Sequence, residues 1–168
     1  IKIPNLKWGV SSQGSNDALA LIPFCRHPTK EWPIMRYAEI GQRYNGPVLL
    51  LGSKTERQKL KSLKDAIGSK ATMLANEGFG DIINAMGNIR IALGGDTGLN
   101  HLCSAFSKPV ITLFGPTQKD DGFWPEAVHT VSTDLPCRPC SRFGGAHCPI
   151  EDHLCMKSIE VDAVWQQI

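Results

Sequence analysis

The sequence has 168 residues, of which 42% are hydrophobic and 20% are charged, a profile typical of one soluble globular domain. A chain of this length buries about two thirds of its unfolded surface, so it can form a hydrophobic core without a metal or a disulfide. The formal net charge of +2 excludes the broad electropositive field that general nucleic-acid binding requires, and we expect no nucleic-acid partner.

Long apolar stretches are missing from the given sequence. No apolar run approaches the ~20 residues of a membrane-spanning helix, and the first residues, Ile1 to Asn5, lack the apolar stretch of a signal peptide. We therefore expect a cytoplasmic protein. Because the chain begins with Ile1 and its first methionine is Met35, we interpret it as a piece of a longer protein.

Short apolar runs alternate with amphipathic segments along the first 132 residues. The apolar runs predict buried strands over residues 17–22, 47–51, 71–74, 89–93, 109–114 and 128–132. Apolar stripes at helical spacing predict helices over residues 31–44, 55–67, 80–86 and 97–106. This alternation with short connections predicts an α/β fold, a Rossmann-like parallel sheet with helices on both faces.

The two ends of the chain differ from this pattern. Residues 1–16 are linker-like, and residues 134–156 form an irregular loop that carries four of the six cysteines. Residues 157–168 predict a C-terminal helix that packs back on the domain, with its apolar residues from Ile159 onward. We treat residues 1–168 as a single domain.

The strongest candidate site is the turn from Gly94 to Gly98, where a predicted strand leads into a helix. Such a turn lies at the carboxyl edge of the sheet, and the first N–H groups of the helix stabilise a phosphate placed over them. Thr97 and His101 are four residues apart, so both face a group at that helix end. The alternative is that Asp96 is only an N-cap and His101 only a surface residue.

Two further segments follow predicted strands and reach the same edge. Lys30 follows the first strand, where a lysine can offer a point charge to a phosphate. Glu56 follows the second strand, where a carboxylate can accept hydrogen bonds from ribose hydroxyls. Each also has a simpler explanation, because Lys30 can be a solvated helix-start residue and Glu56 can simply favour the helix dipole.

Together these segments resemble the carboxyl-terminal half of glycosyltransferase family 9, the lipopolysaccharide heptosyltransferases. The residues that carry the resemblance are Lys30-Glu-Trp-Pro33, Gly52 to Glu56, Asp96-Thr-Gly-Leu-Asn-His101 and Pro109-Val-Ile-Thr-Leu-Phe-Gly-Pro-Thr117. The resemblance implies the GT-B architecture, in which two Rossmann-like domains enclose the active site. This chain would be the donor-binding domain, and the N-terminal acceptor domain would lie outside it.

The resemblance also implies roles for the residues at the phosphates of a nucleotide sugar. Thr97 and Gly98 would hold the diphosphate at the helix terminus, and Lys30 would neutralise it. His101 would lie beside the phosphates.

Other positions would contact the rest of the donor. Glu56 would bind the ribose hydroxyls and Asp96 the donor sugar. Residues 76–78 fall where family members hold the adenine, although their identities are not a close match.

The implied reaction is an inverting transfer of heptose from an ADP-activated sugar to lipopolysaccharide core. It requires no metal or other cofactor. The general base would come from the other domain, so we assign no catalytic residue here and expect the isolated chain to be inactive. The alternatives are a related GT-B transferase or epimerase that uses a UDP or GDP sugar, and a non-catalytic nucleotide-sugar-binding module. The resemblance leaves open a peripheral attachment to the cytoplasmic face of the inner membrane.

The cysteine-bearing loop has its own alternatives. Cys137, Cys140, Cys148 and Cys155 form a CxxC pair followed by two single cysteines, a set that a structural zinc ion can use, although the spacing is irregular. Reduced thiols are the leading interpretation, because disulfides are rare in a cytoplasmic protein. A further alternative for the thiols is a disulfide formed by oxidation during handling. A further alternative for the function is a metal-binding interaction protein built around these cysteines.

Overall fold

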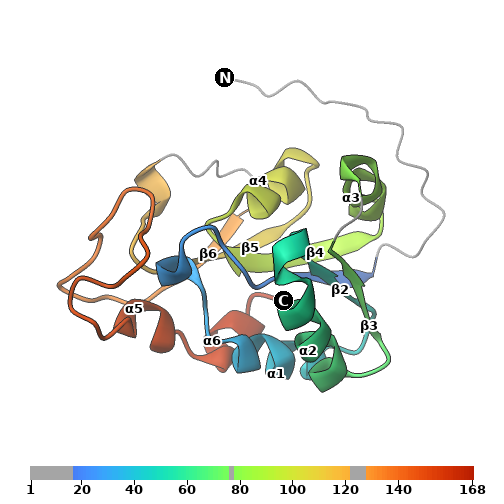
Figure 1. The fold of residues 1–168 in the computed structure, drawn as a ribbon, viewed down its shortest axis with the longest axis horizontal. Coiled ribbons are helices and arrows are strands. Elements are labelled where there is room, and N and C mark those ends of the chain that lie inside the picture. Colours follow the sequence, from blue (N-terminus) through green and yellow to red (C-terminus); the bar gives the residue numbers. More distant parts are fainter. Residues whose placement is uncertain (1–16, 76–77, 122–127) are drawn as a thin grey trace.

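Six parallel strands form the centre of the fold, in the order β3-β2-β1-β4-β5-β6 (Figure 1). The computed structural model describes residues 17–75, 78–121 and 128–168. The strands are β1 (Ala18–Ile22), β2 (Val48–Leu51), β3 (Ala71–Leu74), β4 (Ile89–Gly95), β5 (Val110–Phe114) and β6 (Val128–Ser132). They lie where the apolar runs predict them, so the predicted Rossmann-like parallel sheet is confirmed.

The sheet is apolar because both of its faces are covered. Every residue of β1 is buried, and successive side chains point to opposite faces. Leu19 and Leu21 join one hydrophobic cluster, whereas Ala20 and Ile22 join the other. A strand between two layers of helices must be apolar throughout, which is why these runs do not alternate with polar residues.

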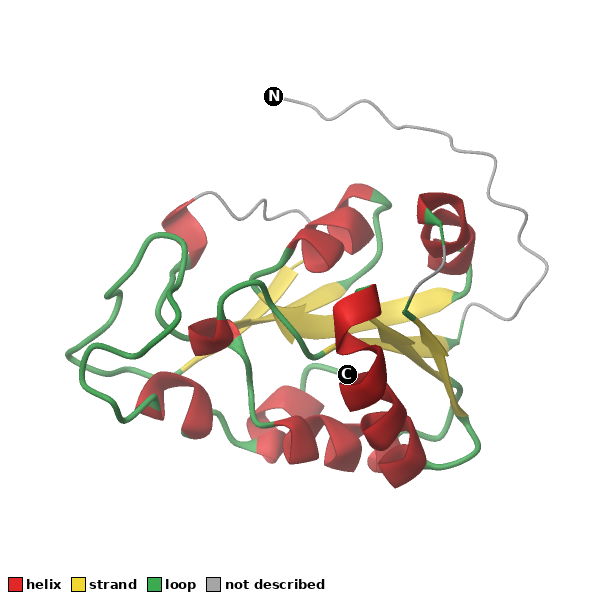
Figure 2. Cartoon of the chain, in the orientation of Figure 1, coloured by secondary structure: helices red, strands yellow, loops and turns green. Residues whose placement is uncertain are grey.

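The helices form one layer on each face of the sheet (Figures 1 and 2). One layer consists of α3 (Phe79–Met86) and α4 (Gly98–Ala105). The other consists of α1 (Ile34–Arg43), α2 (Arg57–Ile67), α5 (Leu154–Lys157) and α6 (Val161–Trp165). Within the described ranges, no helix is both long and apolar enough to cross a membrane.

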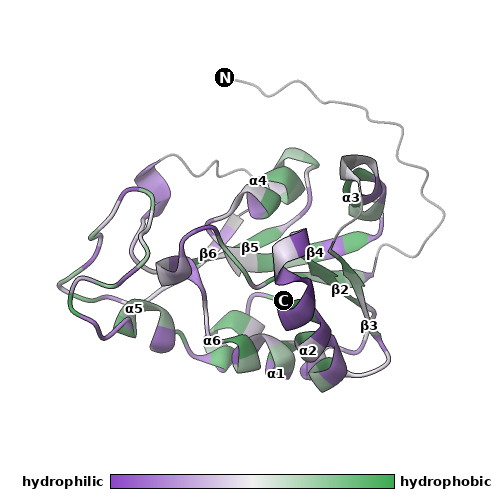
Figure 3. Cartoon of the chain, in the orientation of Figure 1, coloured by the Kyte–Doolittle hydropathy of each residue, from purple (hydrophilic) through white to green (hydrophobic). Residues whose placement is uncertain are grey.

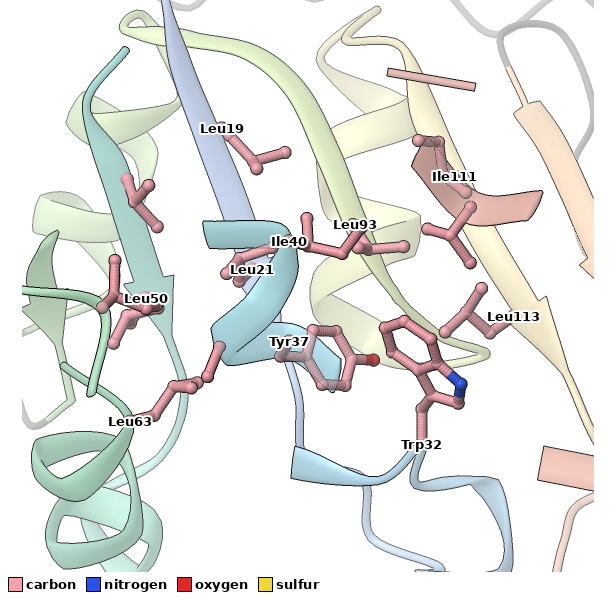
Figure 4. Close-up of a cluster of buried hydrophobic side chains, with 14 of the residues drawn as sticks. Leu19, Leu21, Trp32, Tyr37, Ile40, Leu50, Leu63, Leu93, Ile111 and Leu113 are labelled. Atoms are coloured by element: carbon pink, nitrogen blue, oxygen red, sulfur yellow. The ribbon is translucent and has the colours of Figure 1, made fainter. Parts of the chain in front are cut away.

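The larger cluster of buried side chains lies between the sheet and α1 (Figure 4). Tyr37 and Ile40 of α1 are fully buried against strand residues that include Leu21 and Leu93. Trp32 packs edge-on against Tyr37, with 5.1 Å between the ring centroids. Hydrophobic residues lie along the strands, whereas the outer face of α2 is hydrophilic (Figure 3). The apolar stripe predicted for each helix therefore faces the sheet.

The helix predicted over residues 157–168 is wrong in extent. Two short helices replace it, and α5 begins at Leu154, inside the segment predicted to be irregular. The chain is not helical around Ile159, because the carbonyl of Ile159 accepts hydrogen bonds from Trp32 Nε1, at 2.9 Å, and from Arg36 Nη1. A contact with a distant segment thus interrupts the local helical pattern.

The strand order creates a crevice between β1 and β4. From β1 the chain extends the sheet towards β2 and β3, and from β4 it extends the sheet in the opposite direction. Loops that leave the carboxyl ends of β1 and β4 diverge at this point, which is where open α/β sheets bind ligands.

Gly95, the last residue of β4, allows the two loops to meet. A Cβ atom at this position would lie 2.6 Å from the backbone oxygen of Lys30 and 3.0 Å from Cys25 Sγ. We expect Gly95→Ala to lower the free energy of unfolding by about 1–3 kcal/mol, because neither the Lys30 backbone nor the half-buried Cys25 thiol can easily move away. Urea denaturation measures this change.

Gly80→Ala is the matched control, because a Cβ atom at Gly80 in α3 would have no contact within 4 Å. Alanine is the better helix former by about 0.5–1 kcal/mol, so the free energy of unfolding should stay constant or rise. Equal effects of the two substitutions would contradict the crowding at Gly95.

Candidate functional site

The carboxylate of Asp96 lies at the centre of the crevice and binds groups from three other segments. Its Oδ2 atom is 3.0 Å from Lys30 Nζ, and its Oδ1 atom is 3.3 Å from His101 Nε2. Thr117 Oγ1 donates a third hydrogen bond, 3.3 Å long, to Oδ2. The side chains of Lys30 and Asp96 are only 11% and 19% exposed. The loops after β1 and β5 and the first turns of α4 therefore meet on one carboxylate.

These contacts control the ionisation of Asp96. Burial by itself would raise the pKa of the carboxyl group. The hydrogen bonds from His101 and Lys30 outweigh burial, so the pKa of Asp96 is lower than its usual value. Asp96 is therefore an ionised acceptor at neutral pH.

Thr97, and not Asp96, caps α4. The Oγ1 atom of Thr97 accepts a hydrogen bond from the backbone N–H of Asn100 at 3.4 Å. The alternative that made Asp96 the N-cap is therefore wrong, because the capping position falls one residue later. This leaves the Asp96 carboxylate for Lys30 and His101, so His101 is not merely a surface residue either.

The first turn of α4 is open to a ligand at Gly98. A Cβ atom at Gly98 would have no contact within 4 Å, so the backbone there can be approached closely. The first N–H groups of a helix have no carbonyl partner within the helix and carry the positive end of its dipole. Thr97 and Gly98 thus form a suitable seat for an anion.

Asn100 fixes this turn to the sheet. It is fully buried, and its Nδ2 atom donates to the carbonyl oxygens of Gly95, at 3.0 Å, and Ile111, at 3.4 Å. Asn100 therefore orients α4 and lies beneath the site. This role was not predicted from the sequence.

Two open cavities flank the start of α4. The first, here called the polar cavity, has a volume of about 360 Å³ and is lined by Arg26, His27, Lys30, Asp96, Thr97, Gly98, His101, Gln118, Asp121, Arg142 and Phe143. The second, here called the side cavity, has a volume of about 410 Å³ and is lined by Phe24, Cys25, Arg26, Ser53, Glu56, Thr97, Gly98, Leu99 and Leu102. Arg26, Thr97 and Gly98 line both, so the helix start lies between a polar space and a more apolar one.

All six residues predicted to bind the donor line these cavities, five in the polar cavity and Glu56 in the side cavity. The contacts of Glu56 match its simpler explanation, because its Oε2 atom accepts the backbone N–H of Ser53 at 2.6 Å in a capping box. Residues 76–77, at the predicted adenine position, and the linker-like residues 1–16 lie outside the described residues.

Several residues that line the polar cavity were not predicted from the sequence. Arg26 and His27 lie in the loop that follows β1, so their position at the carboxyl edge could have identified them. Gln118 and Asp121 follow the Thr117 that ends the family motif. Arg142 and Phe143 come from the cysteine-bearing loop, and no local pattern marks them.

The cysteines of that loop do not form a recognisable metal site. Cys137 and Cys148 are half-buried, Cys140 is exposed and Cys155 is buried. In the part of the chain that the structure describes, no three His, Cys, Asp or Glu side chains are arranged to hold a metal ion. The zinc alternative therefore has no geometric support here.

The two remaining cysteines lie near the sheet. Cys103 is fully buried in α4, whereas Cys25 is half-buried beside Lys30. Burial raises the pKa of each thiol to about 12, so both are protonated at neutral pH. Cys103 therefore packs as a small apolar side chain, whereas Cys25 does so only in part.

The family of the chain follows from its match to known proteins. The model of glycosyltransferase family 9 (heptosyltransferase) matches residues 7–147. The chain belongs to this family. It is 29% identical over 129 residues to lipopolysaccharide heptosyltransferase 1 of Pseudomonas aeruginosa, an alignment that covers 74% of this chain and 36% of that relative.

Solved structures share the fold of this family member. A family 9 glycosyltransferase from Veillonella parvula superimposes with a TM-score of 0.75 at 14% identity, covering 95% of this chain and 46% of that one. The Escherichia coli heptosyltransferase WaaC with ADP gives a TM-score of 0.67 at 17% identity, covering 94% and 44%. The chain thus spans less than half the length of these proteins.

The lowered pKa of Asp96 predicts a pH-dependent contribution to stability. At pH 7 we expect Asp96→Asn to lower the free energy of unfolding by about 1–3 kcal/mol, because the charged hydrogen bonds to Lys30 and His101 weaken. In the unfolded chain the carboxyl group has a pKa of about 3.9. The wild-type advantage should therefore be complete above that value and disappear as the pH falls through the lower pKa of the folded state.

Urea denaturation of both proteins between pH 7 and pH 2.5 measures this difference. Asp65→Asn, at an exposed position on α2, serves as the control. If the free energies of unfolding of wild type and Asp96→Asn changed identically with pH, the Asp96 contacts would not favour the ionised carboxylate.

Proposed function

We propose that this family 9 chain is the donor-binding domain of an inverting glycosyltransferase that transfers heptose from an ADP-activated sugar to lipopolysaccharide core. The observation that carries the proposal is the open start of α4 at the crevice between β1 and β4. Ionised Asp96 lies beside this helix start, and a cavity lies on each side of it. The named relatives support it, since one is a lipopolysaccharide heptosyltransferase and another was solved with ADP.

A nucleotide sugar fits the order of the two cavities. The nucleoside would occupy the side cavity, where Phe24, Leu99 and Leu102 offer apolar contacts. Glu56 would accept the ribose hydroxyls in the same cavity. The diphosphate would then lie over the start of α4, and the sugar would enter the polar cavity beside Asp96.

The chemistry in this proposal depends on charge at the leaving group. As the bond between sugar and diphosphate breaks, negative charge grows on the phosphate that departs. Fixed N–H groups at Thr97 and Gly98 would stabilise this charge more strongly in the transition state than in the ground state. Such groups are part of the protein, so the proposed scheme requires no metal ion or other cofactor.

The acceptor site and the general base would belong to the part of the full-length enzyme that this chain does not span. An acceptor hydroxyl must lose its proton during the transfer. We propose that the base comes from the other domain of a GT-B enzyme, and that this chain alone binds the donor without turning it over. Attachment of the whole enzyme to the inner membrane surface is part of the same proposal.

The nucleotide preference of this chain tests the proposal. We expect calorimetric titration to show that ADP binds at least ten-fold more tightly than UDP or GDP. Preference for UDP or GDP would favour a related transferase or epimerase. Failure of the folded chain to bind any of the three would overturn the proposed role in donor binding. Binding of ADP without turnover of ADP-heptose by the full-length enzyme would favour a non-catalytic module.

Two substitutions test the assignment of the phosphate site. Lys30→Glu would bring a second carboxylate within a few ångströms of Asp96, and Thr97→Trp would fill the space above the helix start. Each substitution should lower the affinity for ADP by about ten-fold or more, while the affinity for adenosine should change by less than about two-fold. The reason is that both substitutions act on the phosphates, which adenosine lacks.

Lys61→Glu, at an exposed position on α2, controls for the change in net charge. Equal losses for ADP and adenosine would contradict the assignment of Lys30 and Thr97 to the phosphates.

A further inference from the structure

The cysteine-bearing loop folds back onto the residues that follow β1. The hydroxyl of Thr29 donates to the carbonyl oxygen of Gly145 at 2.9 Å and accepts the N–H of Gly145 at 2.8 Å. The backbone N–H of Thr29 also donates to Gly145 O at 3.3 Å. Thr29 is buried, with 6% of its surface exposed, so these bonds are shielded from water. The loop is therefore attached next to Lys30, although 116 residues separate the two partners.

Internal contacts fix the shape of residues 141–145. Ser141 Oγ accepts the backbone N–H groups of Phe143, at 3.3 Å, and Gly144, at 2.9 Å. Gly144 has a φ of +88°, and a Cβ atom there would lie 2.9 Å from His27 Cβ and 3.0 Å from Lys30 Cγ. A glycine is required by both the conformation and the space. The loop thus packs directly against two residues of the polar cavity.

This packing brings Arg142 and Phe143 to the polar cavity that Lys30 and Asp96 also line. Phe143 is 66% exposed, so its ring is accessible at the cavity wall. The guanidinium carbon of Arg142 lies 5.4 Å from the centre of the Phe143 ring. Contact with the aromatic face restricts where the guanidinium can point.

The charges of the cavity distinguish Arg142 from Lys30. The ammonium group of Lys30 is paired with Asp96 at 3.0 Å. Within the described residues, no carboxylate forms an ion pair with Arg142. Arg142 therefore brings to the cavity a positive charge that, among the described residues, is not held in an ion pair.

We propose that Arg142 binds the second phosphate of the nucleoside diphosphate sugar, the phosphate that bears the sugar, with Phe143 as its positioning residue. The inference rests on the proposed function and extends it to a residue outside the family motif. In the proposed arrangement the first phosphate lies at the boundary of the two cavities and the second extends into the polar cavity. A guanidinium group matches two oxygens of a phosphate and gains strength from its charge.

The experiment compares ADP, AMP and adenosine by calorimetric titration of the full chain. For Arg142→Ala we expect the affinity for ADP to fall by about ten- to a hundred-fold, while the affinities for AMP and adenosine change by less than about two-fold. Arg142→Lys should recover part of the affinity for ADP, because it restores the charge but not the planar fork. Arg90→Ala, an exposed arginine near the opposite end of β4, is the matched control and should bind all three as wild type does.

Thr29→Val tests the attachment of the loop without changing any charge. It removes the hydroxyl that binds Gly145, so the affinity for ADP should fall. In the double variant this loss of affinity should not add to the loss caused by Arg142→Ala. Unchanged affinity of Arg142→Ala for ADP would overturn the inference, as would equal losses for ADP and AMP. Wild-type protein that binds no ADP would instead overturn the proposed function, and the inference with it.

Discussion

The ion pair between Lys30 and Asp96 connects the two halves of the sheet at the point where they diverge. Lys30 follows β1 and Asp96 follows β4, and both side chains are largely buried. A largely buried charge that loses its partner destabilises the folded state, so each residue constrains the position of the other. Thr117 adds the loop after β5 to the same carboxylate. The geometry of the whole crevice therefore depends on this pair.

The same ion pair limits what Lys30 can do for a phosphate. A lysine whose charge is balanced at 3.0 Å adds little net positive potential to the cavity. The potential that an anion meets must then come from the start of α4 and from the arginines at the cavity wall. In the proposed arrangement Asp96 orients Lys30, and the start of α4 and Arg142 would supply most of the positive potential that the phosphates meet.

Local sequence patterns predicted the sheet and the helix start because both depend on neighbouring residues. The apolar runs identified all six strands, and the turn from Gly94 to Gly98 identified the crevice. The N-cap was misplaced by one residue, since Asp96 and Thr97 are both good capping residues and only the tertiary contacts of Asp96 separate them.

Contacts between distant segments could not be predicted in this way. The break near Ile159 depends on Trp32 and Arg36, which no local pattern links to it. The place of Arg142 depends equally on Thr29 and Gly145. Glycine, serine and cysteine in an irregular segment indicate a loop, but they do not indicate what the loop covers.

The cysteine-bearing segment acquires its position from the end of β5 as well as from Thr29. Arg138 donates to the carbonyl oxygens of Gly115, Thr117 and Thr133, so one guanidinium group links the segment to the residues that follow β5 and β6. Thr117 in turn binds Asp96. The loop that supplies Arg142 and the carboxylate opposite it are therefore joined through the same short stretch of backbone. Backbone contacts of this kind can hold the cavity wall in place whether or not the cysteines ever bind a metal.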